Sequence, residues 1–274
     1  MTAWQDGTAP EVARITARGW SRVLRRGAPV VLLLAVAFPV LLVLRGPERL
    51  LRGDTRPLTP WITQVVCIVS LRLMGLRRRV RGAPSPARGA CVANHSSWLD
   101  IFVLNASKRV FFVAKAEVAG WPVIGWLARG TGTLFIRRDR REARRQQTLF
   151  EERLRAGHHL LFFPEGTSTD GARVLPFKTT LFAAFTTEAL RGFLTVQPVS
   201  LRYHAPEGED ACFYGWWGDM NFAHGLLKVL AVRRQGWVDV VYHPPLRVAD
   251  YPDRKALAAA CEAAVRTGFS EAAR

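Results

Sequence analysis

The sequence has few cysteines, and none of them has the spacing of a metal site. Its 274 residues include four, which are Cys67, Cys91, Cys212 and Cys261. No two of them form a Cys-x2-Cys pair, and no histidine lies beside them at the spacing of a zinc ligand. We therefore expect reduced structural thiols and no metal ion.

Acidic residues and lysines are also scarce. The chain has 39 basic and 22 acidic residues, for a formal net charge of +17, and only five of the basic residues are lysine. Such a surface suits a membrane surface, a phosphate-bearing substrate, an acidic carrier protein or nucleic acid. A non-enzymatic basic protein that binds nucleic acid would explain the charge. However, no helix-turn-helix, RNA-recognition or zinc-finger pattern is present, so we expect no nucleic-acid partner.

Charge is absent from one long stretch near the N-terminus. Residues 28–44 are 17 residues without a charge, between basic flanks. As a helix they would extend about 26 Å against a hydrocarbon core of about 30 Å, which makes a borderline membrane span. Pro39 would kink that helix. We interpret residues 1–60 as a membrane anchor, and we expect the protein at the cytoplasmic face of a bacterial inner membrane.

A second apolar segment follows the first. It begins at Trp61 and ends in Arg77, Arg78 and Arg79. A leading tryptophan and a basic end are typical of a helix in the headgroup region, although a buried helix with a solvated arginine tail would look similar. We assign residues 61–82 to an interfacial helix and linker.

Residues 83–274 alternate between strand and helix patterns and form the expected catalytic domain. The predicted strands are 90–93, 110–114, 133–136, 160–163, 194–201 and 237–242, and the predicted helices are 98–106, 117–128, 141–156, 179–191 and 253–267. This alternation predicts an α/β fold with a largely parallel central sheet flanked by helices, and a site at the carboxyl ends of the strands. Pro198 suggests a bulge or a strand end rather than a regular central strand.

His95 and Asp100 lie directly after the first of these strands. A histidine can take a proton from a substrate hydroxyl, and a carboxylate on its other nitrogen fixes the tautomer. Five residues turn through about 500° on a continuous helix, so the pair requires His95 in a turn and Asp100 in the first turn of a helix. Ser97-x-x-Asp100 also fits a capping box, in which the acid only accepts backbone hydrogen bonds.

Two further groups of polar residues follow predicted strands. Arg137 and Arg138 end the strand at 133–136, and arginine is suited to binding phosphate in a bidentate manner. Glu165 and Gly166 follow the strand at 160–163. A carboxylate there can hold substrate hydroxyls, and the glycine lets the backbone approach a ligand closely.

In this order the blocks resemble the glycerolipid acyltransferase family, which includes the 1-acylglycerol-3-phosphate acyltransferases. The resemblance rests on four motifs: Asn-His-x4-Asp at 94–100, Gly-x-x-Phe-Ile-x-Arg at 132–138, Phe-Pro-Glu-Gly-Thr at 163–167 and Val-x-Pro-Val at 196–199. It implies that His95 is the general base for an acceptor hydroxyl and that Asp100 orients it. It also implies that Lys115, Arg138, Glu165, Gly166 and Thr167 bind the acceptor.

The resemblance implies a membrane-bound O-acyltransferase that uses no cofactor, no metal and no acyl-enzyme. The co-substrate would be a thioester of coenzyme A or of acyl carrier protein. The sequence contains no Gly-x-Ser-x-Gly nucleophile elbow, which agrees with direct transfer. A lipid hydrolase, in which water replaces the acceptor, is an alternative of a different class.

The third motif departs from the usual family form, which continues with an arginine thought to help hold phosphate. Here that position is Ser168, and Arg137, Arg173 or Lys178 could supply the missing charge. The expected acceptor is 1-acyl-sn-glycerol-3-phosphate, which would give phosphatidic acid. The alternative is lyso-ornithine lipid, since the altered motif resembles relatives that acylate it.

Overall fold

The structure is a computed structural model that describes residues 14–137, 143–218 and 220–273. Its strands are β1 (Arg77–Arg81), β2 (Gly89–Ala93), β3 (Phe111–Lys115), β4 (Leu134–Ile136), β5 (Leu160–Phe162), β6 (Thr195–His204), β7 (Trp237–Tyr242) and β8 (Leu246–Arg247). Its α-helices are α1 (Ala17–Arg52), α2 (Thr59–Met74), α3 (Asp100–Ser107), α4 (Ile124–Thr131), α5 (Ala143–Arg155), α6 (Glu188–Arg191), α7 (Phe222–Ala231) and α8 (Arg254–Glu271). Short 3-10 helices are η1 (Gly53–Thr55), η2 (Ala116–Gly120), η3 (Thr179–Phe182) and η4 (Val248–Asp250).

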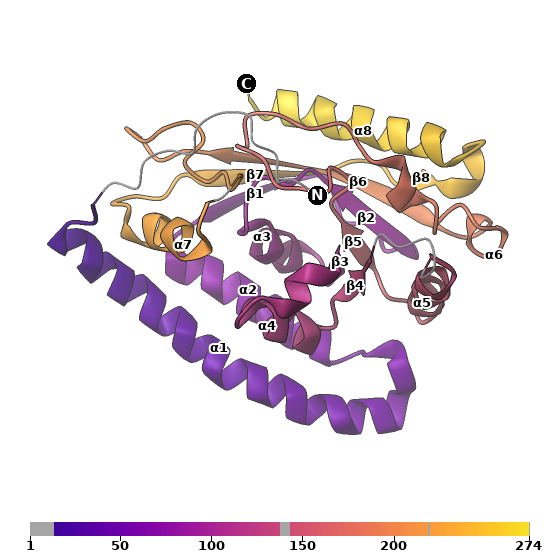
Figure 1. The fold of residues 1–274 in the computed structure, drawn as a ribbon, viewed down its shortest axis with the longest axis horizontal. Coiled ribbons are helices and arrows are strands. Elements are labelled where there is room, and N and C mark those ends of the chain that lie inside the picture. Colours follow the sequence, from indigo (N-terminus) through magenta and orange to yellow (C-terminus); the bar gives the residue numbers. More distant parts are fainter. Residues whose placement is uncertain (1–13, 138–142, 219, 274) are drawn as a thin grey trace.

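In the described ranges the strands form one sheet in the order β1-β7-β6-β2-β5-β3-β4, with β8 beside β6. Strands β2 to β6 are mutually parallel, whereas β7 and β8 run antiparallel to β6. This arrangement confirms the predicted α/β fold with a largely parallel sheet (Figure 1). The carboxyl ends of β2, β3, β4 and β5 therefore meet at one edge of the sheet.

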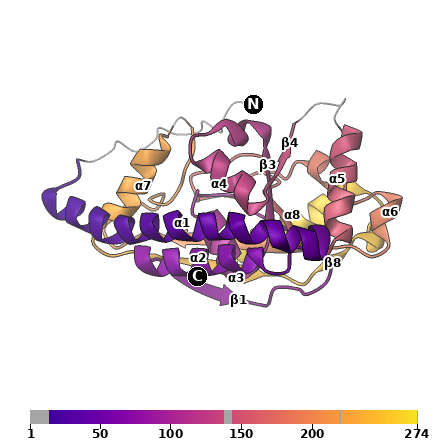
Figure 2. The same ribbon diagram turned by 90° about the horizontal axis from the view of Figure 1, so that it is seen from below.

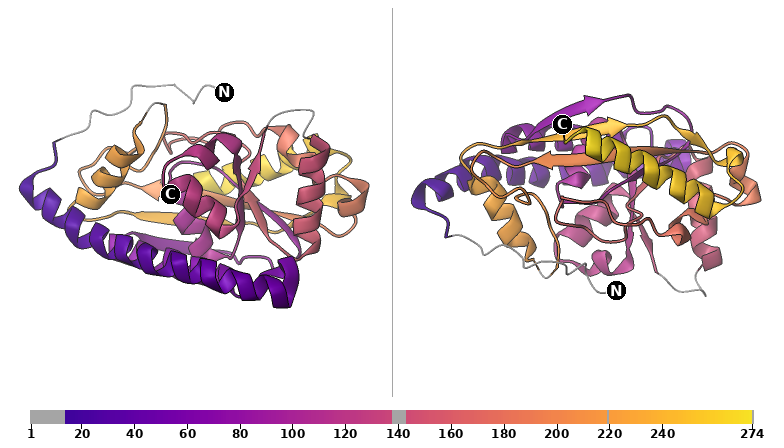
Figure 3. Two further views of the ribbon diagram at one scale, coloured as in Figure 1. Left: turned by 60° about the horizontal axis from the view of Figure 1, so that its bottom comes forward. Right: turned by 90° about the horizontal axis from the view of Figure 1, so that it is seen from above.

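Helices cover both faces of this sheet, and the pleat of β2 shows how the sequence supports both layers. Cys91 and Ala93 belong to the core beneath α2 and α3, whereas Ala90 and Val92 belong to the core beneath α5 and α8. Neighbouring residues of a strand point to opposite faces, so an uninterrupted apolar strand is what a sheet buried on both faces requires. Figure 3 shows α8 lying across the face opposite to α1 and α2.

Helix α1 contains the apolar segment 28–44 and runs along the flank of the domain beside α2 (Figure 2). It is the one helix of the described residues that is long and apolar enough to cross a membrane. Its N-terminal part is held to α7, because Arg26 donates to the carbonyls of Leu230 and Val232. The opposite side of α1 is exposed, since Val31 is 66% exposed and Val43 is 72% exposed. The segment is therefore a candidate anchor that lies against its own domain.

The sequence analysis expected the arginines after the second apolar segment to form the end of a helix, but they do not. Helix α2 ends at Met74, because Gly75 adopts a left-handed conformation with φ 81° that reverses the chain. Arg77–Arg81 then form β1, which pairs with β7 at the edge of the sheet. Arg79 lies over the ring of Trp237 at 4.4 Å. A charged edge strand resists pairing with other chains, which gives these arginines a structural role.

Two predicted helices are also interrupted. The helix predicted at 117–128 is divided into η2 and α4, because Pro122 cannot continue a helix and restricts the residue before it. The helix predicted at 179–191 is reduced to η3 and α6. Phe182 at the end of η3 and Phe185 after it are fully buried, and the ring centroid of each lies 5.3 Å from that of Phe162. Burial of these rings decides the local conformation there.

Pro198 lies inside the central strand β6, in register with Val92 of β2, so the expected bulge or strand end is wrong. The Pro198 carbonyl accepts a hydrogen bond from the backbone of His243. A residue's nitrogen and carbonyl point to the same side of a strand, so the missing N–H faces the gap between β7 and β8. Its partner there would be the His243 carbonyl, which instead accepts a hydrogen bond from Gln197 Nε2 at 2.9 Å. No acceptor is left unsatisfied, so the proline is tolerated.

Candidate active site

His95 and Asp100 form a hydrogen-bonded pair at the carboxyl end of β2. His95 Nδ1 lies 2.7 Å from Asp100 Oδ2. His95 stands in the loop after the strand and Asp100 is the first residue of α3, which is the geometry that the spacing required. The helix begins two residues later than the predicted start at residue 98. Asp100 is fully buried, while the His95 side chain keeps 18% of its surface exposed.

The capping interpretation of Asp100 holds as well. The same Oδ2 atom accepts the backbone N–H groups of Ser96 at 2.8 Å and Ser97 at 3.0 Å. The carboxylate therefore fixes the loop that carries His95 as well as the ring itself. Because Nδ1 is engaged by Asp100, Nε2 is the nitrogen that can face an acceptor hydroxyl.

Tyr203 of β6 completes the pair, and the sequence analysis missed it. Its hydroxyl donates to the other carboxylate oxygen, Asp100 Oδ1, at 2.7 Å. Burial and the neighbouring carboxylate raise the pKa of Tyr203 well above its ordinary value, so its hydroxyl is a donor. The signal available in the sequence was only a tyrosine in the strand that contains Val-x-Pro-Val, 103 residues away from its partner.

The His95 ring is also held from one face. It stacks on Phe163 with a centroid distance of 4.0 Å and an interplanar angle of 11°. The His95 carbonyl accepts hydrogen bonds from the backbone N–H and the hydroxyl of Thr169. Asn94 exchanges two hydrogen bonds with the backbone of Leu201, which ties the loop to β6. The imidazole therefore occupies one fixed orientation.

Glu165 follows β5 and lies beneath the histidine loop. Its two oxygens accept the backbone N–H groups of His95 and Leu175, each at 2.6 Å, and the residue is 1% exposed. Burial raises the pKa of Glu165 to about 8, an effect opposed by the two backbone hydrogen bonds. In this structure the Glu165 carboxyl group positions the backbone of His95, and its predicted contact with substrate hydroxyls stays a prediction.

The remaining predicted ligands lie at the same edge. Gly166 has φ 73° and donates to the Phe163 carbonyl in a tight turn, next to half-buried Thr167. Lys115 is the last residue of β3 and pairs in register with Ile136 of β4. Arg138 lies outside the described residues. The structure thus brings His95, Glu165, Gly166, Thr167 and Lys115 to one edge of the sheet.

The segment after β6 flanks this edge of the sheet. The Trp216 backbone N–H donates to the carbonyls of Ser96 and Thr169, at 2.9 Å and 3.1 Å. Its ring meets Trp121 edge to face, with centroids 5.8 Å apart. An aromatic wall therefore stands beside the histidine loop. Among the described residues, no three His, Cys, Asp or Glu side chains gather as a metal site would require.

The arrangement can perform one step of acid–base chemistry. An ordered imidazole with a buried carboxylate behind it can accept a proton from a hydroxyl that approaches Nε2. The carboxylate would stabilise the imidazolium, and Tyr203 would hold the carboxylate. No serine or cysteine side chain in the described part of the chain forms a hydrogen bond with the His95 ring, so the arrangement favours direct attack by the substrate's own hydroxyl.

Comparison with known proteins identifies the family. A family model described as acyltransferase matches residues 77–202. The chain is 58% identical over 271 residues to the lyso-ornithine lipid O-acyltransferase of Rhodobacter capsulatus, covering 99% of this chain and 98% of that protein. It is 32% identical over 188 residues to the 1-acyl-sn-glycerol-3-phosphate acyltransferase of Neisseria gonorrhoeae, covering 68% and 71%.

A solved structure agrees with the fold. The crystal structure of the acyltransferase PlsC from Thermotoga maritima has a TM-score of 0.58 and 22% identity, covering 90% of this chain and 97% of that one. At that identity the likeness shows the fold alone. The long match to the Rhodobacter relative shows that the chain belongs to the acyltransferase family.

Proposed function

We propose that this protein transfers an acyl group from a thioester to the free hydroxyl of lyso-ornithine lipid. The observation that carries this proposal is the 58% identity, over nearly the whole of both chains, to a protein of that name. The sequence analysis placed this acceptor second, behind 1-acyl-sn-glycerol-3-phosphate. The length of the match now favours it, and Ser168 in the third motif agrees with an acceptor that carries no phosphate.

In this mechanism His95 Nε2 takes the proton of the acceptor hydroxyl as its oxygen attacks the thioester carbonyl. The carbon–sulfur bond then breaks, and the imidazolium returns the proton to the leaving thiolate. Asp100 accepts a hydrogen bond from the Nδ1–H of His95 and stabilises the positive charge that develops on the imidazole. Tyr203 and Glu165 hold Asp100 and His95 in position. The protein itself forms no covalent bond with the acyl group.

Acylation of 1-acyl-sn-glycerol-3-phosphate is the second candidate. The Neisseria relative carries that name, and Arg173 and Lys178 follow the altered motif. Arg173 is 51% exposed and forms an ion pair with Asp170 at 3.1 Å, so its charge is already shared with a carboxylate. This partial neutralisation favours the phosphate-free acceptor.

Exposed apolar side chains of the kind found in membrane-associated proteins support a lipid acceptor. Besides the bare side of α1, Trp126 of α4 is 56% exposed and its ring meets Phe38 of α1 at 4.4 Å. Exposed tryptophan beside an apolar helix is typical of a protein in the headgroup region. We propose that α1 lies in the membrane surface, at the cytoplasmic face of a bacterial inner membrane. The donor is an acyl thioester of coenzyme A or of acyl carrier protein, both of which suit a basic protein.

The test offers lyso-ornithine lipid and 1-acyl-sn-glycerol-3-phosphate to detergent-solubilised protein with an acyl thioester. We expect the ratio of the two kcat/KM values to favour lyso-ornithine lipid. The Ser168→Arg variant should shift that ratio toward the phosphate acceptor. A preference of the wild type for the phosphate acceptor would overturn the assignment, and release of free fatty acid without any acceptor would indicate a hydrolase.

A further inference from the structure

A cluster of arginines lies at the amino ends of the strands, whereas the active site lies at their carboxyl ends. Arg56 and Arg153 both approach the ring of Phe111, with guanidinium carbons 5.8 Å and 4.7 Å from its centroid. Phe111 begins β3 and Lys115 ends it, so four steps of about 3.3 Å put the cluster about 13 Å from the catalytic edge. Arg45 joins the cluster from α1 and donates to the Gly130 carbonyl.

Several N–H groups of this cluster have no partner. Among the described residues, the buried atoms Arg45 Nε, Arg56 Nη1 and Arg153 Nε have no hydrogen-bond acceptor. Arg153 is only 9% exposed. Burial, together with the charges of Arg56 and Arg45, lowers the pKa of Arg153 to about 10. Buried donors without acceptors and adjacent like charges are both unfavourable, and both would be relieved by an anion.

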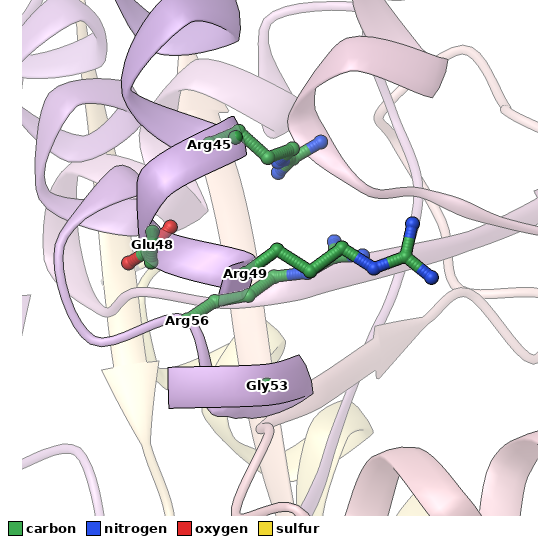
Figure 4. Close-up of a pocket in the computed structure, with 6 residues that line it drawn as sticks. Arg45, Glu48, Arg49, Gly53 and Arg56 are labelled. Carbon is green, nitrogen blue, oxygen red and sulfur yellow. The ribbon is translucent and has the colours of Figure 1, made fainter. Parts of the chain in front are cut away.

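Glu48, the acidic residue of the hollow described below, does not supply that anion fully. Glu48 and Asp54 are the acidic groups that act on these arginines. The Glu48 carboxylate accepts the backbone N–H groups of Leu58 and Thr59 and the Thr59 hydroxyl, so its hydrogen-bonding capacity is used elsewhere. Figure 4 shows Glu48 pointing away from the side to which Arg45, Arg49 and Arg56 extend.

Arg45 and Arg56 of this cluster, together with Arg49, line a hollow of about 210 Å³ at the end of α1. Its lining residues are Arg45, Gly46, Glu48, Arg49, Gly53 and Arg56. Guanidinium groups match the oxygens of a phosphate in pairs, and this volume has room for such a group. Exposed leucines neighbour the lining residues in the chain: Leu50 and Leu51 follow Arg49 and are 89% and 80% exposed, and Leu58 is 62% exposed. An anion site near exposed leucines fits a lipid headgroup better than a soluble metabolite.

We propose that this hollow binds the phosphate of an anionic phospholipid and so fixes the end of α1 at the membrane surface. The site is separate from the acceptor site, because it lies at the amino ends of the strands. The proposed ligand of this hollow also differs chemically from the proposed acceptor, which carries no phosphate. The membrane phospholipid is thus a ligand of the protein and not its substrate.

The test measures the unfolding temperature of the full-length protein in neutral detergent with short-chain phosphatidylglycerol, with a short-chain diacylglycerol, or with inorganic phosphate at constant ionic strength. Phosphatidylglycerol should raise the unfolding temperature and diacylglycerol should not. The Arg45→Gln/Arg56→Gln variant should bind phosphatidylglycerol at least about tenfold more weakly, as expected for losing charged hydrogen bonds. Arg52→Gln, an exposed arginine of the same turn that does not line the hollow, is the matched control.

Equal protection of the double variant and the wild type would overturn the site. Protection by inorganic phosphate but not by phosphatidylglycerol would support a phosphate-binding site and would overturn the proposal that its ligand is a lipid. Removing two like charges should leave the ligand-free unfolding temperature unchanged or higher, so the double variant should fold. Arg49→Gln, at an exposed residue of the lining, provides a second variant that should weaken lipid binding without a folding defect.

Discussion

Removal of the Tyr203 hydroxyl tests whether the buried network controls catalysis. Tyr203→Phe deletes the hydrogen bond to Asp100 Oδ1 and leaves the ring in place. A hydrogen bond to a charged group is worth about 1.5 to 3 kcal/mol, or roughly 10-fold to 150-fold in rate if it is needed only in the transition state. The contacts of Oδ2 with His95, Ser96 and Ser97 remain. We therefore expect a loss of kcat near the lower end, about tenfold, with KM unchanged.

The matched control is Tyr214→Phe. Tyr214 is also buried, its ring lies 5.3 Å from that of Tyr203, and its hydroxyl donates to Gln235 rather than to Asp100. Both variants should lose similar stability, which thermal unfolding would show, but only Tyr203→Phe should lose kcat in steady-state acyl transfer. Equal effects of the two variants on kcat would refute the role of Tyr203 as a positioning residue.

Three further outcomes are expected. Burial raises the pKa of Glu165 from 4.5 to about 8, so the folded protein retains a proton that the unfolded chain releases, and the unfolding free energy should fall between about pH 4.5 and 8. Glu165→Gln should flatten that slope in chemical denaturation measured across the window, and an unchanged slope would exclude Glu165 as its source. Pro198→Val should change stability by less than about 1 kcal/mol in the same assay, because valine keeps the carbonyl that accepts from His243, and Gln197 already donates to the His243 carbonyl. A larger change would contradict this account of Pro198. Replacing Val31 and Val43 of α1 by glutamine should weaken cosedimentation with phospholipid vesicles but leave the unfolding temperature unchanged, and full retention would place the anchor elsewhere.

Local sequence patterns predicted the elements that carry the site. The apolar strand at 90–93 and the polar turn after it placed His95 and Asp100 correctly, because strand ends and helix starts are determined by nearby residues. The five-residue spacing between His95 and Asp100 also predicted that His95 lies outside the helix that begins at Asp100. The position of Glu165 after β5 was also predictable, but its hydrogen bonds to His95 and Leu175 were not, since they depend on how two loops pack.

The features that the sequence did not predict depend on long-range contacts. Arg77–Arg81 form a strand only because β7, far away in sequence, offers an open edge. The hydrogen bond between Tyr203 and Asp100 likewise joins segments that are about a hundred residues apart. The same separation applies to the cluster of Arg45, Arg56 and Arg153. Neither composition nor periodicity contains information on such neighbours.

The measurement that tests the central claim most directly is acyl transfer by His95→Ala with lyso-ornithine lipid and an acyl thioester, beside the wild type. Loss of the general base should lower kcat by about 10² to 10⁴ or more, while binding to phospholipid vesicles and the unfolding temperature stay close to those of the wild type. Turnover by a folded, membrane-bound His95→Ala variant at the wild-type rate would contradict the assignment of His95 as the base.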